Sequence, residues 1–458
     1  MNTIFQDAST LANALAAGNL TSVALTEKVL AKIAATDNDI RAFISIMGES
    51  ARTDAAASDA RRLAGQSLGP LDGIPVAVKD NIAVAGVPTT SGTAAFPQVA
   101  KVDAVTVARL RAAGAVIIGT LNMHEGALGS STDNPHWGRC QNPLRVGFTP
   151  GGSSGGSAAA IAGGMVPLTL GTDTMGSVRI PAAYCGLWAL KPTKGRIPVT
   201  GLSHLSWTLD SIGPLARSPS DLGLMLLATE GFDPYDPISN ALTMQKPLMH
   251  KALSDMTFGV PDAAALAECE SVVTESFARI AAALQQAGAK LLPIKIEGWF
   301  PGALRRAGLL ISEVEGAVGM ESALDGVGLS DDFRAMLDYG RQAKSSRVAL
   351  AYRQLQQLAV GFNNAVAGLD GILLPTTPQR AFAHGSIAPA SQADFTALAN
   401  IAGAPALSLP IAAVDGGLPV GVQIIGGLWQ DLELIEIGKL MADLQPVREW
   451  AKQMEGHE

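Results

Sequence analysis

One pattern constrains the fold of this chain most: twice, a helix-like segment, a glycine and a short apolar segment follow one another. The first instance spans residues 106–120, with Gly114 before the strand-like AVIIGT. The second spans residues 277–294, with Gly288 in the corresponding place. Glycine often ends a helix, and strands that alternate with helices usually lie parallel in a covered sheet. The pattern predicts an α/β fold with a large, mixed, mostly parallel twisted sheet covered by helices on both faces.

The rest of the chain favours one large domain, because it contains no internal repeat and no low-complexity linker. Short apolar runs predict buried strands in LDGIPVAV, GILLPTTP and GLPVGVQIIGG, which begin at Leu71, Gly371 and Gly417. We expect a single domain over residues 1–458 with four parts. These are N-terminal helices at 1–65, a core at 66–230, a mostly helical peripheral insertion at 231–365 that begins with a loop at 232–251, and the C-terminal part of the core at 366–445.

Composition argues against several classes of protein. The net charge is −8 and no Lys/Arg-rich run occurs, so we expect no nucleic-acid partner. The N-terminus lacks the pattern of a signal peptide, and no apolar stretch approaches ~20 residues, so no membrane span is expected. Cys140, Cys185 and Cys269 are widely spaced and the histidines are scattered, which predicts neither disulfides nor a metal site. These features are typical of a cytoplasmic protein without a metal.

The first segment that suggests chemistry ends in Lys79, which directly follows the apolar run Pro75-Val76-Ala77-Val78. If this strand is buried, the ammonium group is poorly hydrated and its pKa should fall. The alternative is a lysine at the end of a strand whose stem packs while its amine reaches water. The segment alone leaves both interpretations open.

The second segment is the loop PGGSSGGS, which begins at Pro150 and runs into an Ala-rich helix. Glycines let backbone amides converge, and a helix N-terminus adds partial positive charge. Such a loop is compatible with a phosphate cradle or a mobile linker. However, it lacks the G-K-[ST] ending of a P-loop, and linkers rarely run straight into a helix.

The third segment, LGTDTMGSVRIPA, presents Ser177 between Asp173 and Arg179. A serine needs a neighbouring base to become a nucleophile, and successive amides of a turn can stabilise an oxyanion. No histidine lies nearby in the sequence and no G-x-S-x-G motif is present, which argues against a Ser-His-Asp triad. A lysine base is then the natural candidate, and Lys79 is available.

Together these three segments closely resemble the signature of the amidase signature family. Further matches are IIGTLNM, STDN, CGLWALKPTKGRIP, TLDSIGPLAR, NIAGAPALSLP and GLPVGVQIIG. The resemblance covers nearly the whole chain and implies the amidase signature fold.

The resemblance also implies roles for individual residues. Ser177 corresponds to the nucleophile, Ser153 to a bridging serine preceded by a cis peptide bond, and Lys79 to the base. The oxyanion hole corresponds to the main-chain amides of the three residues before the nucleophile. The side chains expected to hold the loop and the serine pair in place correspond to three further positions. The three amides are those of Thr174, Met175 and Gly176; the three supporting side chains are Asp173, Arg179 and Ser154.

Met175 departs from the family pattern, because many relatives carry glycine at this position. A side chain fits there only if the backbone φ is negative and a cavity receives it. Met175 therefore either shapes the wall of the substrate pocket or packs beneath the loop.

The resemblance implies an amidohydrolase that cleaves a linear C–N bond of a small-molecule amide through an acyl-enzyme, without a cofactor. Met123, His124, Ser131 and Trp137 are candidates for the pocket wall, although core packing explains the histidine and the tryptophan equally well. Hydrazides and carbamoyl or urea-like substrates remain open. So does assembly into a homodimer.

Three rival functions fit the sequence less well. The first is the glutaminase (A) subunit of a tRNA-dependent amidotransferase, which needs partner subunits. It usually shows D-x-x-T before N-x-A-G, and Asp394-Phe395-Thr396 has a different spacing, which weakens this interpretation. A silent scaffold is disfavoured because all three triad positions are present. A nucleotide-binding transferase is disfavoured because it would need a phosphate-binding lysine and magnesium ligands in motif context.

Overall fold

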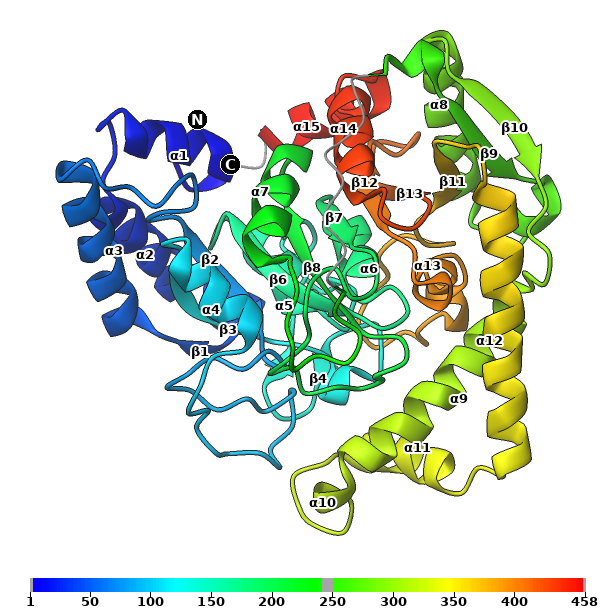
Figure 1. The fold of residues 1–458 in the computed structure, drawn as a ribbon, viewed down its shortest axis with the longest axis horizontal. Coiled ribbons are helices and arrows are strands. Elements are labelled where there is room, and N and C mark those ends of the chain that lie inside the picture. Colours follow the sequence, from blue (N-terminus) through cyan, green and yellow to red (C-terminus); the bar gives the residue numbers. More distant parts are fainter. Residues whose placement is uncertain (1–2, 241–250, 456–458) are drawn as a thin grey trace.

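The structure, a computed structural model, describes residues 3–240 and 251–455, and its centre is one mixed sheet of 11 strands (Figure 1). The strand order is β1-β3-β2-β6-β8-β7-β12-β13-β11-β9-β10. The middle of the loop expected at 232–251 lies outside the described residues. The strands of the sheet are β1 Phe43–Ile46, β2 Pro75–Lys79, β3 Val116–Leu121, β6 Leu168–Asp173, β7 Trp188–Lys191, β8 Ser211–Ala216, β9 Thr257–Pro261, β10 Lys290–Ile294, β11 Gly371–Pro375, β12 Ala406–Ile411 and β13 Val420–Ile425; β4 Asp133–Asn134 and β5 Gly138–Arg139 form a separate ribbon.

The sheet is parallel near its two ends and antiparallel in between. β3, β2 and β6 pair in parallel, as do β11, β9 and β10, and the other neighbours pair antiparallel. The expected α/β fold with a large, mixed, helix-covered sheet is confirmed, but fewer pairs are parallel than the prediction assumed. One reason is that residues 412–419, which join β12 to β13, are too few for the crossover that a parallel pair requires.

Helices cover both faces of the sheet. Val76 and Val78 of β2 pack into one hydrophobic cluster, whereas Ala77 packs into another. Because successive side chains of a strand point to opposite faces, each face has its own core. The helices are α1 Ala8–Ala16, α2 Ser22–Ile40, α3 Gly48–Leu63, α4 Val105–Ala112, α5 Gly155–Ala162, α6 Arg179–Tyr184, α7 Pro219–Thr229, α8 Ser271–Gln286, α9 Pro301–Gly319, α10 Glu321–Leu324, α11 Asp331–Arg341, α12 Ser345–Val366, α13 Ala397–Ala402, α14 Asp431–Met441 and α15 Gln445–Glu455; short 3₁₀ turns are η1 Thr3–Phe5, η2 Glu125–Ala127, η3 Leu253–Asp255, η4 Ala263–Leu266 and η5 Ala390–Ala393.

The range 231–365, expected as a mostly helical insertion, contributes to the sheet as well. β9, α8 and β10 fall in this range, and β9 and β10 extend the sheet at one edge. Helices α9–α12 follow and project from the sheet as a helical layer (Figure 1). Both α11 and α12 pack on α9. Only the second half of the range is therefore peripheral.

The sheet brings the ends of β2 and β6 together. These strands are parallel neighbours, with Val78 opposite Leu170, so Lys79 and Asp173 end their strands at the same edge. α5 packs on β2, β3, β6 and β8, and the glycine-rich loop leads into its N-terminus. The carboxyl ends of parallel strands are where open α/β sheets usually bind ligands.

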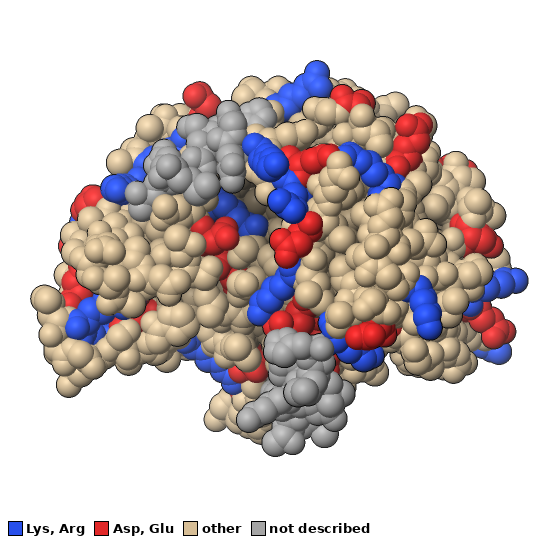
Figure 2. Space-filling view, turned by 90° about the horizontal axis from the view of Figure 1, so that it is seen from above, with Lys and Arg blue, Asp and Glu red and all other residues tan. Residues whose placement is uncertain are grey.

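No helix within residues 3–240 and 251–455 is long and apolar enough to cross a bilayer. On the face in Figure 2, Lys and Arg are interspersed with Asp and Glu. The sequence likewise carries a net charge of −8 and no basic run.

Candidate active site

Lys79 lies at the end of β2 with its side chain fully buried. Its Nζ lies 2.7 Å from Ser153 Oγ and 2.7 Å from Thr172 Oγ1. Burial lowers the pKa of Lys79 from 10.5 to about 7, although Asp210 and Asp173 act in the opposite direction. The interpretation of a solvated lysine at a strand end is therefore excluded. A large fraction of the amine is uncharged at neutral pH.

The glycine-rich loop places Ser153 against Lys79 by close packing. A Cβ at Gly155 would lie 2.3 Å from Thr132 Oγ1, and a Cβ at Gly156 would lie 2.4 Å from Asn122 O. Only glycine allows such approaches. The peptide bond between Gly152 and Ser153 is cis, as the family resemblance implies. Because its serines are fully buried, the loop is neither a mobile linker nor an open phosphate cradle.

Ser177 follows β6 and lines a cavity, with 8% of its surface exposed. The N–H of Ser154 donates to Ser177 O at 3.1 Å, and Ser154 Oγ donates to Thr172 O at 3.1 Å. These bonds hold the glycine-rich loop beside the turn after β6. The resemblance implies two contacts in the triad. The one between Lys79 and Ser153 is present. The one between Ser153 and Ser177 is not formed, because Ser177 Oγ makes no hydrogen bond to any described residue.

Asp173 organises the turn that presents Ser177. Its carboxylate accepts from both Nε and Nη2 of Arg179 at 3.0 Å, and from the N–H groups of Gly176 and Val178. Burial alone would raise the pKa of Asp173, but Arg179, Lys191 and Asn400 together outweigh it and lower the pKa to about 2. Asn400 donates to the same carboxylate. Asp173 is therefore a permanent anion that holds the turn.

The amides expected to form an oxyanion hole are not equally available. The N–H groups of Thr174 and Met175 have no acceptor among the described residues. That of Gly176 donates to Asp173 Oδ1 at 2.6 Å, because the carboxylate lies beneath the turn. Thr174 is held in place by its own hydroxyl, which donates to Asp210 Oδ1 at 2.7 Å. Two of the three expected amides are therefore free to donate.

Met175 fits both of the roles considered for it. Its side chain lines the cavity beside Ser177. It also packs against α9, since a Cβ at Gly308 would lie 2.7 Å from Met175 Sδ. Its φ lies outside the left-handed region, so a side chain is tolerated at this position. Met175 therefore shapes the pocket and joins it to α9.

The cavity beside Ser177 has a volume of about 380 Å³ and includes two of the four expected wall residues. His124 and Ser131 line it, with 3.4 Å between His124 Nδ1 and Ser131 Oγ. Met123 and Trp137 do not: Met123 packs in a hydrophobic cluster, and Trp137 Nε1 donates to Thr93 O at 3.2 Å. Sequence neighbours were expected to share the pocket, but adjacent side chains point in different directions.

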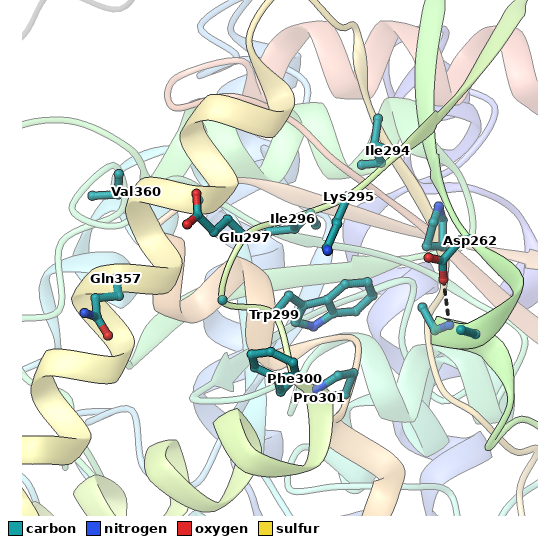
Figure 3. A pocket seen from close by; sticks show the side chains of 15 residues that line it. Asp262, Ile294, Lys295, Ile296, Glu297, Trp299, Phe300, Pro301, Gln357 and Val360 are labelled. Atoms are coloured by element: carbon teal, nitrogen blue, oxygen red, sulfur yellow. Dashed lines mark hydrogen bonds between the residues drawn. The ribbon is translucent and has the colours of Figure 1, made fainter.

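A larger cavity, of about 910 Å³, lies between η4, the end of β10 and α12 (Figure 3). Its wall includes Trp299, Lys295 and Glu297 but no Ser, Thr, Cys or His among the described residues. It therefore lacks a hydroxyl or thiol nucleophile for acyl transfer. No three His, Cys, Asp or Glu side chains in the described parts of the chain come close enough to hold a metal ion.

Several residues of the site were missed by sequence reasoning. Thr172 accepts from Lys79, Asp210 anchors Thr174, and Asn400 and Gln423 accept from Arg179 at 2.7 and 2.8 Å. All four lie in segments that carry the family resemblance. The sequence did not show what these four residues do, because their partners lie up to 244 residues away in the chain.

The chain is similar to known proteins over nearly its whole length. The sequence profile of the family described as Amidase matches residues 24–435. The A subunit of the glutamyl-tRNA(Gln) amidotransferase of Roseiflexus sp. (strain RS-1) is 37% identical over 473 residues, which cover 96% of each chain.

The similar solved structures cover a wider range of enzymes. One, from a study of a vestigial protein complex and the origins of an s-triazine catabolic enzyme, has a TM-score of 0.89 and 33% identity, covering 96% of this chain and 98% of that one. Peptide amidase from Stenotrophomonas maltophilia has a TM-score of 0.84 and 30% identity, covering 96% and 98%. The A subunit of the glutamyl-tRNA(Gln) amidotransferase from Thermotoga maritima has a TM-score of 0.78 and 30% identity, covering 92% and 91%.

Proposed function

We propose, from the premise that the chain belongs to the amidase family, that it hydrolyses a C–N bond of a small-molecule amide with Ser177 as the nucleophile. In this proposal Ser153 relays the proton and Lys79 is the base. The observation that carries it is the 2.7 Å contact between the buried Nζ of Lys79 and Ser153 Oγ. An amine with a pKa of about 7 can exchange a proton with a hydroxyl near neutral pH.

The reaction runs through an acyl-enzyme. Lys79 Nζ takes the proton of Ser153 Oγ, which takes the proton of Ser177 Oγ as that oxygen attacks the amide carbon. When the C–N bond breaks, the proton returns along the same path to the leaving nitrogen. Water then attacks the ester, gives its proton to the relay, and releases the acid and Ser177. The step requires Ser177 Oγ to reach Ser153 Oγ, a contact that often tightens only with substrate bound.

The negative charge that develops on the carbonyl oxygen needs donors in place before the reaction. The free N–H groups of Thr174 and Met175 supply two. Removing one such donor from a hydrolase typically lowers kcat by about 10²–10³-fold. Asp173 and Arg179 contribute by fixing the turn, since each of them is fully buried and bound to the other.

A second candidate is the glutaminase (A) subunit of a glutamyl-tRNA(Gln) amidotransferase. Sequence similarity favours it, because the curated relatives at 37% identity carry the name of that subunit. In this case the chain would work with other subunits, and its amide would be that of glutamine. The same triad serves both candidates, so the residues proposed for catalysis do not distinguish them.

Turnover by the purified chain alone distinguishes the two candidates. We expect release of the amine product from at least one member of a panel of small amides, hydrazides, carbamoyl compounds and glutamine. Hydrolysis of simple amides without partners supports the amidohydrolase. If glutamine is the only member of the panel that is hydrolysed, and only after partner subunits have been added, the second candidate is supported.

Ser177→Ala tests the nucleophile common to both candidates. We expect turnover to fall by about 10⁴-fold or more, because the other hydroxyl that this turn places at the cavity, that of Thr174, is already bound to Asp210 Oδ1. Circular dichroism and the melting temperature should stay those of the wild type. Hydrolysis that survives this change would remove Ser177 from the proposal.

A further inference from the structure

A single charged side chain lies in the wall of the cavity beside Ser177. Arg305 lines this cavity, and no other described residue of the wall is Lys, Arg, Asp or Glu. His124 also lines it, but burial lowers the pKa of His124 to about 4, so it is uncharged at neutral pH. The cavity therefore presents one positive charge to a molecule bound next to the nucleophile.

Arg305 faces the cavity because of its position on α9. Arg305, Leu309 and Ser312 all line the cavity, and their i, i+4, i+7 spacing places them on one face of the helix. Nε of Arg305 donates to Asp394 Oδ1 at 2.5 Å. Gln392 lines the cavity, but Asp394 does not. Asp394 thus holds the guanidinium from outside the cavity wall.

Most hydrogen-bond donors of Arg305 are unused. Asp394 accepts one bond, at Nε, and neither Nη group donates to a described residue. The side chain is only 18% exposed. An arginine held at Nε still presents its two Nη groups side by side, which matches the two oxygens of a carboxylate. In a largely apolar wall an anion gains more from such donors than it would in water.

We infer that Arg305 binds a carboxylate of the substrate, and that the substrates are amides with a carboxylate remote from the scissile bond. This inference rests on the proposed function and names its substrate class. A cavity of about 380 Å³ is small for a ligand pocket, which favours monoamides of short dicarboxylic acids. Glutamine carries the same carboxylate but adds an ammonium group, for which the described wall offers no carboxylate partner.

Two probes of equal chain length isolate the contribution of the carboxylate. Glutaramate is the monoamide of glutaric acid, and pentanamide carries a methyl group in place of its carboxylate. We expect wild-type kcat/KM to be about 10-fold or more higher for glutaramate. Arg305→Met should lower kcat/KM for glutaramate by about 10- to 100-fold and change that for pentanamide by less than about 3-fold.

Arg306→Met is the matched control. Arg306 is the next residue and carries the same charge, but it is exposed and does not line the cavity. Its kcat/KM for glutaramate should equal that of the wild type. Because Arg305→Met leaves the Asp394 carboxylate without its partner, the double variant Arg305→Met/Asp394→Asn is tested as well. The double variant should show the same loss of kcat/KM for glutaramate, and it replaces the single variant in the test if the single variant folds poorly.

The outcomes separate this inference from the proposed function. Equal use of both probes by the wild type, or equal loss for both in the variants, overturns the role of Arg305 and leaves amide hydrolysis standing. If neither probe is hydrolysed, calorimetric titration of the Ser177→Ala protein decides: tighter binding of glutaramate that disappears with Arg305→Met supports the inference, and equal or absent binding overturns it. Hydrolysis that survives Ser177→Ala overturns the proposed function instead.

Discussion

At the scale of single residues, the site depends on the burial of an amine. Lys79 has no exposed surface, and burial lowers its pKa from 10.5 to about 7. The hydroxyls of Ser153 and Thr172 each lie 2.7 Å from its Nζ, so the uncharged amine is still hydrogen-bonded. In the proposed mechanism this burial lets Lys79 act as a base near neutral pH, and it also lowers the stability of the fold.

Lys79→Met tests both consequences. The variant should lose about 10²–10⁴-fold in turnover, because the base is gone. The wild-type rate should rise with pH through about 7, as the amine loses its proton. Between pH 7 and 10.5 the unfolded chain binds more protons than the folded one, so wild-type stability should rise relative to the variant by up to about 1.4 kcal/mol per pH unit.

Denaturant titrations of both proteins at several pH values in that window measure the difference in stability. Below the window the folded and unfolded states both bind the proton, so the difference should stop changing. If the free energies of unfolding of the wild type and Lys79→Met differ by the same amount at every pH in the window, Lys79 is not buried as an uncharged amine.

Arg179 holds the carboxylate of Asp173 in place. Arg179 and Asp173 are fully buried and joined by two hydrogen bonds. Arg179→Met leaves the carboxylate without its cation, which should lower the free energy of unfolding by about 3–5 kcal/mol. Urea denaturation measures the loss. The double variant Arg179→Met/Asp173→Asn should lose less, and a larger loss in the double variant would contradict this account.

At the scale of helices and strands, much of the structure follows from local pattern. The strand expected at LDGIPVAV is β2, Pro75–Lys79, and the segment predicted at 290–294 is β10, Lys290–Ile294. The helix expected at 277–287 is α8, Ser271–Gln286, which begins earlier than the prediction. Apolar periodicity and a terminal glycine were sufficient for these elements, because both signals are local.

The order of the strands and most of the pocket wall did not follow from local pattern. β2 lies between β3 and β6, and β13 lies between β12 and β11, choices that depend on contacts between distant segments. Arg305 was not among the expected wall residues, although it lines the cavity, because nothing local in the sequence shows which way its side chain points. Helix α9 turns it toward Ser177, and only the packing of α9 on the core decides that orientation.

Gly340→Ala tests how closely α11 must approach α9. A Cβ at Gly340 would lie 2.3 Å from the backbone carbon of Glu313, so the two helices would have to separate. We expect a loss of about 1–3 kcal/mol, although alanine favours a helix over glycine. The melting temperature reports it. Gly223→Ala in α7 is the control, because the nearest atom to its Cβ would be 3.6 Å away and the change should not destabilise.

At the scale of the whole molecule, the site is assembled from segments far apart in the chain. Lys79 comes from β2, Ser153 from the loop before α5, Ser177 from the turn after β6, and Arg305 from α9. Arg179 reaches Asn400 and Gln423 near the end of the chain. The turn that carries Ser177 therefore depends on packing between the two halves of the sequence. A variant at the chain end should act on stability before it acts on chemistry.

Trp450 provides that test. It lies in α15 with 4% of its surface exposed, and its Nε1 donates to Gly186 O at 2.9 Å, between α6 and β7. A Cβ at Gly186 would lie 2.1 Å from the indole ring, so the ring covers the backbone just after the helix that follows Ser177.

Trp450→Ala should lower the free energy of unfolding by about 3–5 kcal/mol. At temperatures where the variant stays folded, kcat should be that of the wild type, because Trp450 does not line the Ser177 cavity. Thermal denaturation and kinetics below the transition measure the two effects, with Trp450→Phe as the milder control. A loss of kcat without a loss of stability would show instead that α15 acts directly on the turn of Ser177.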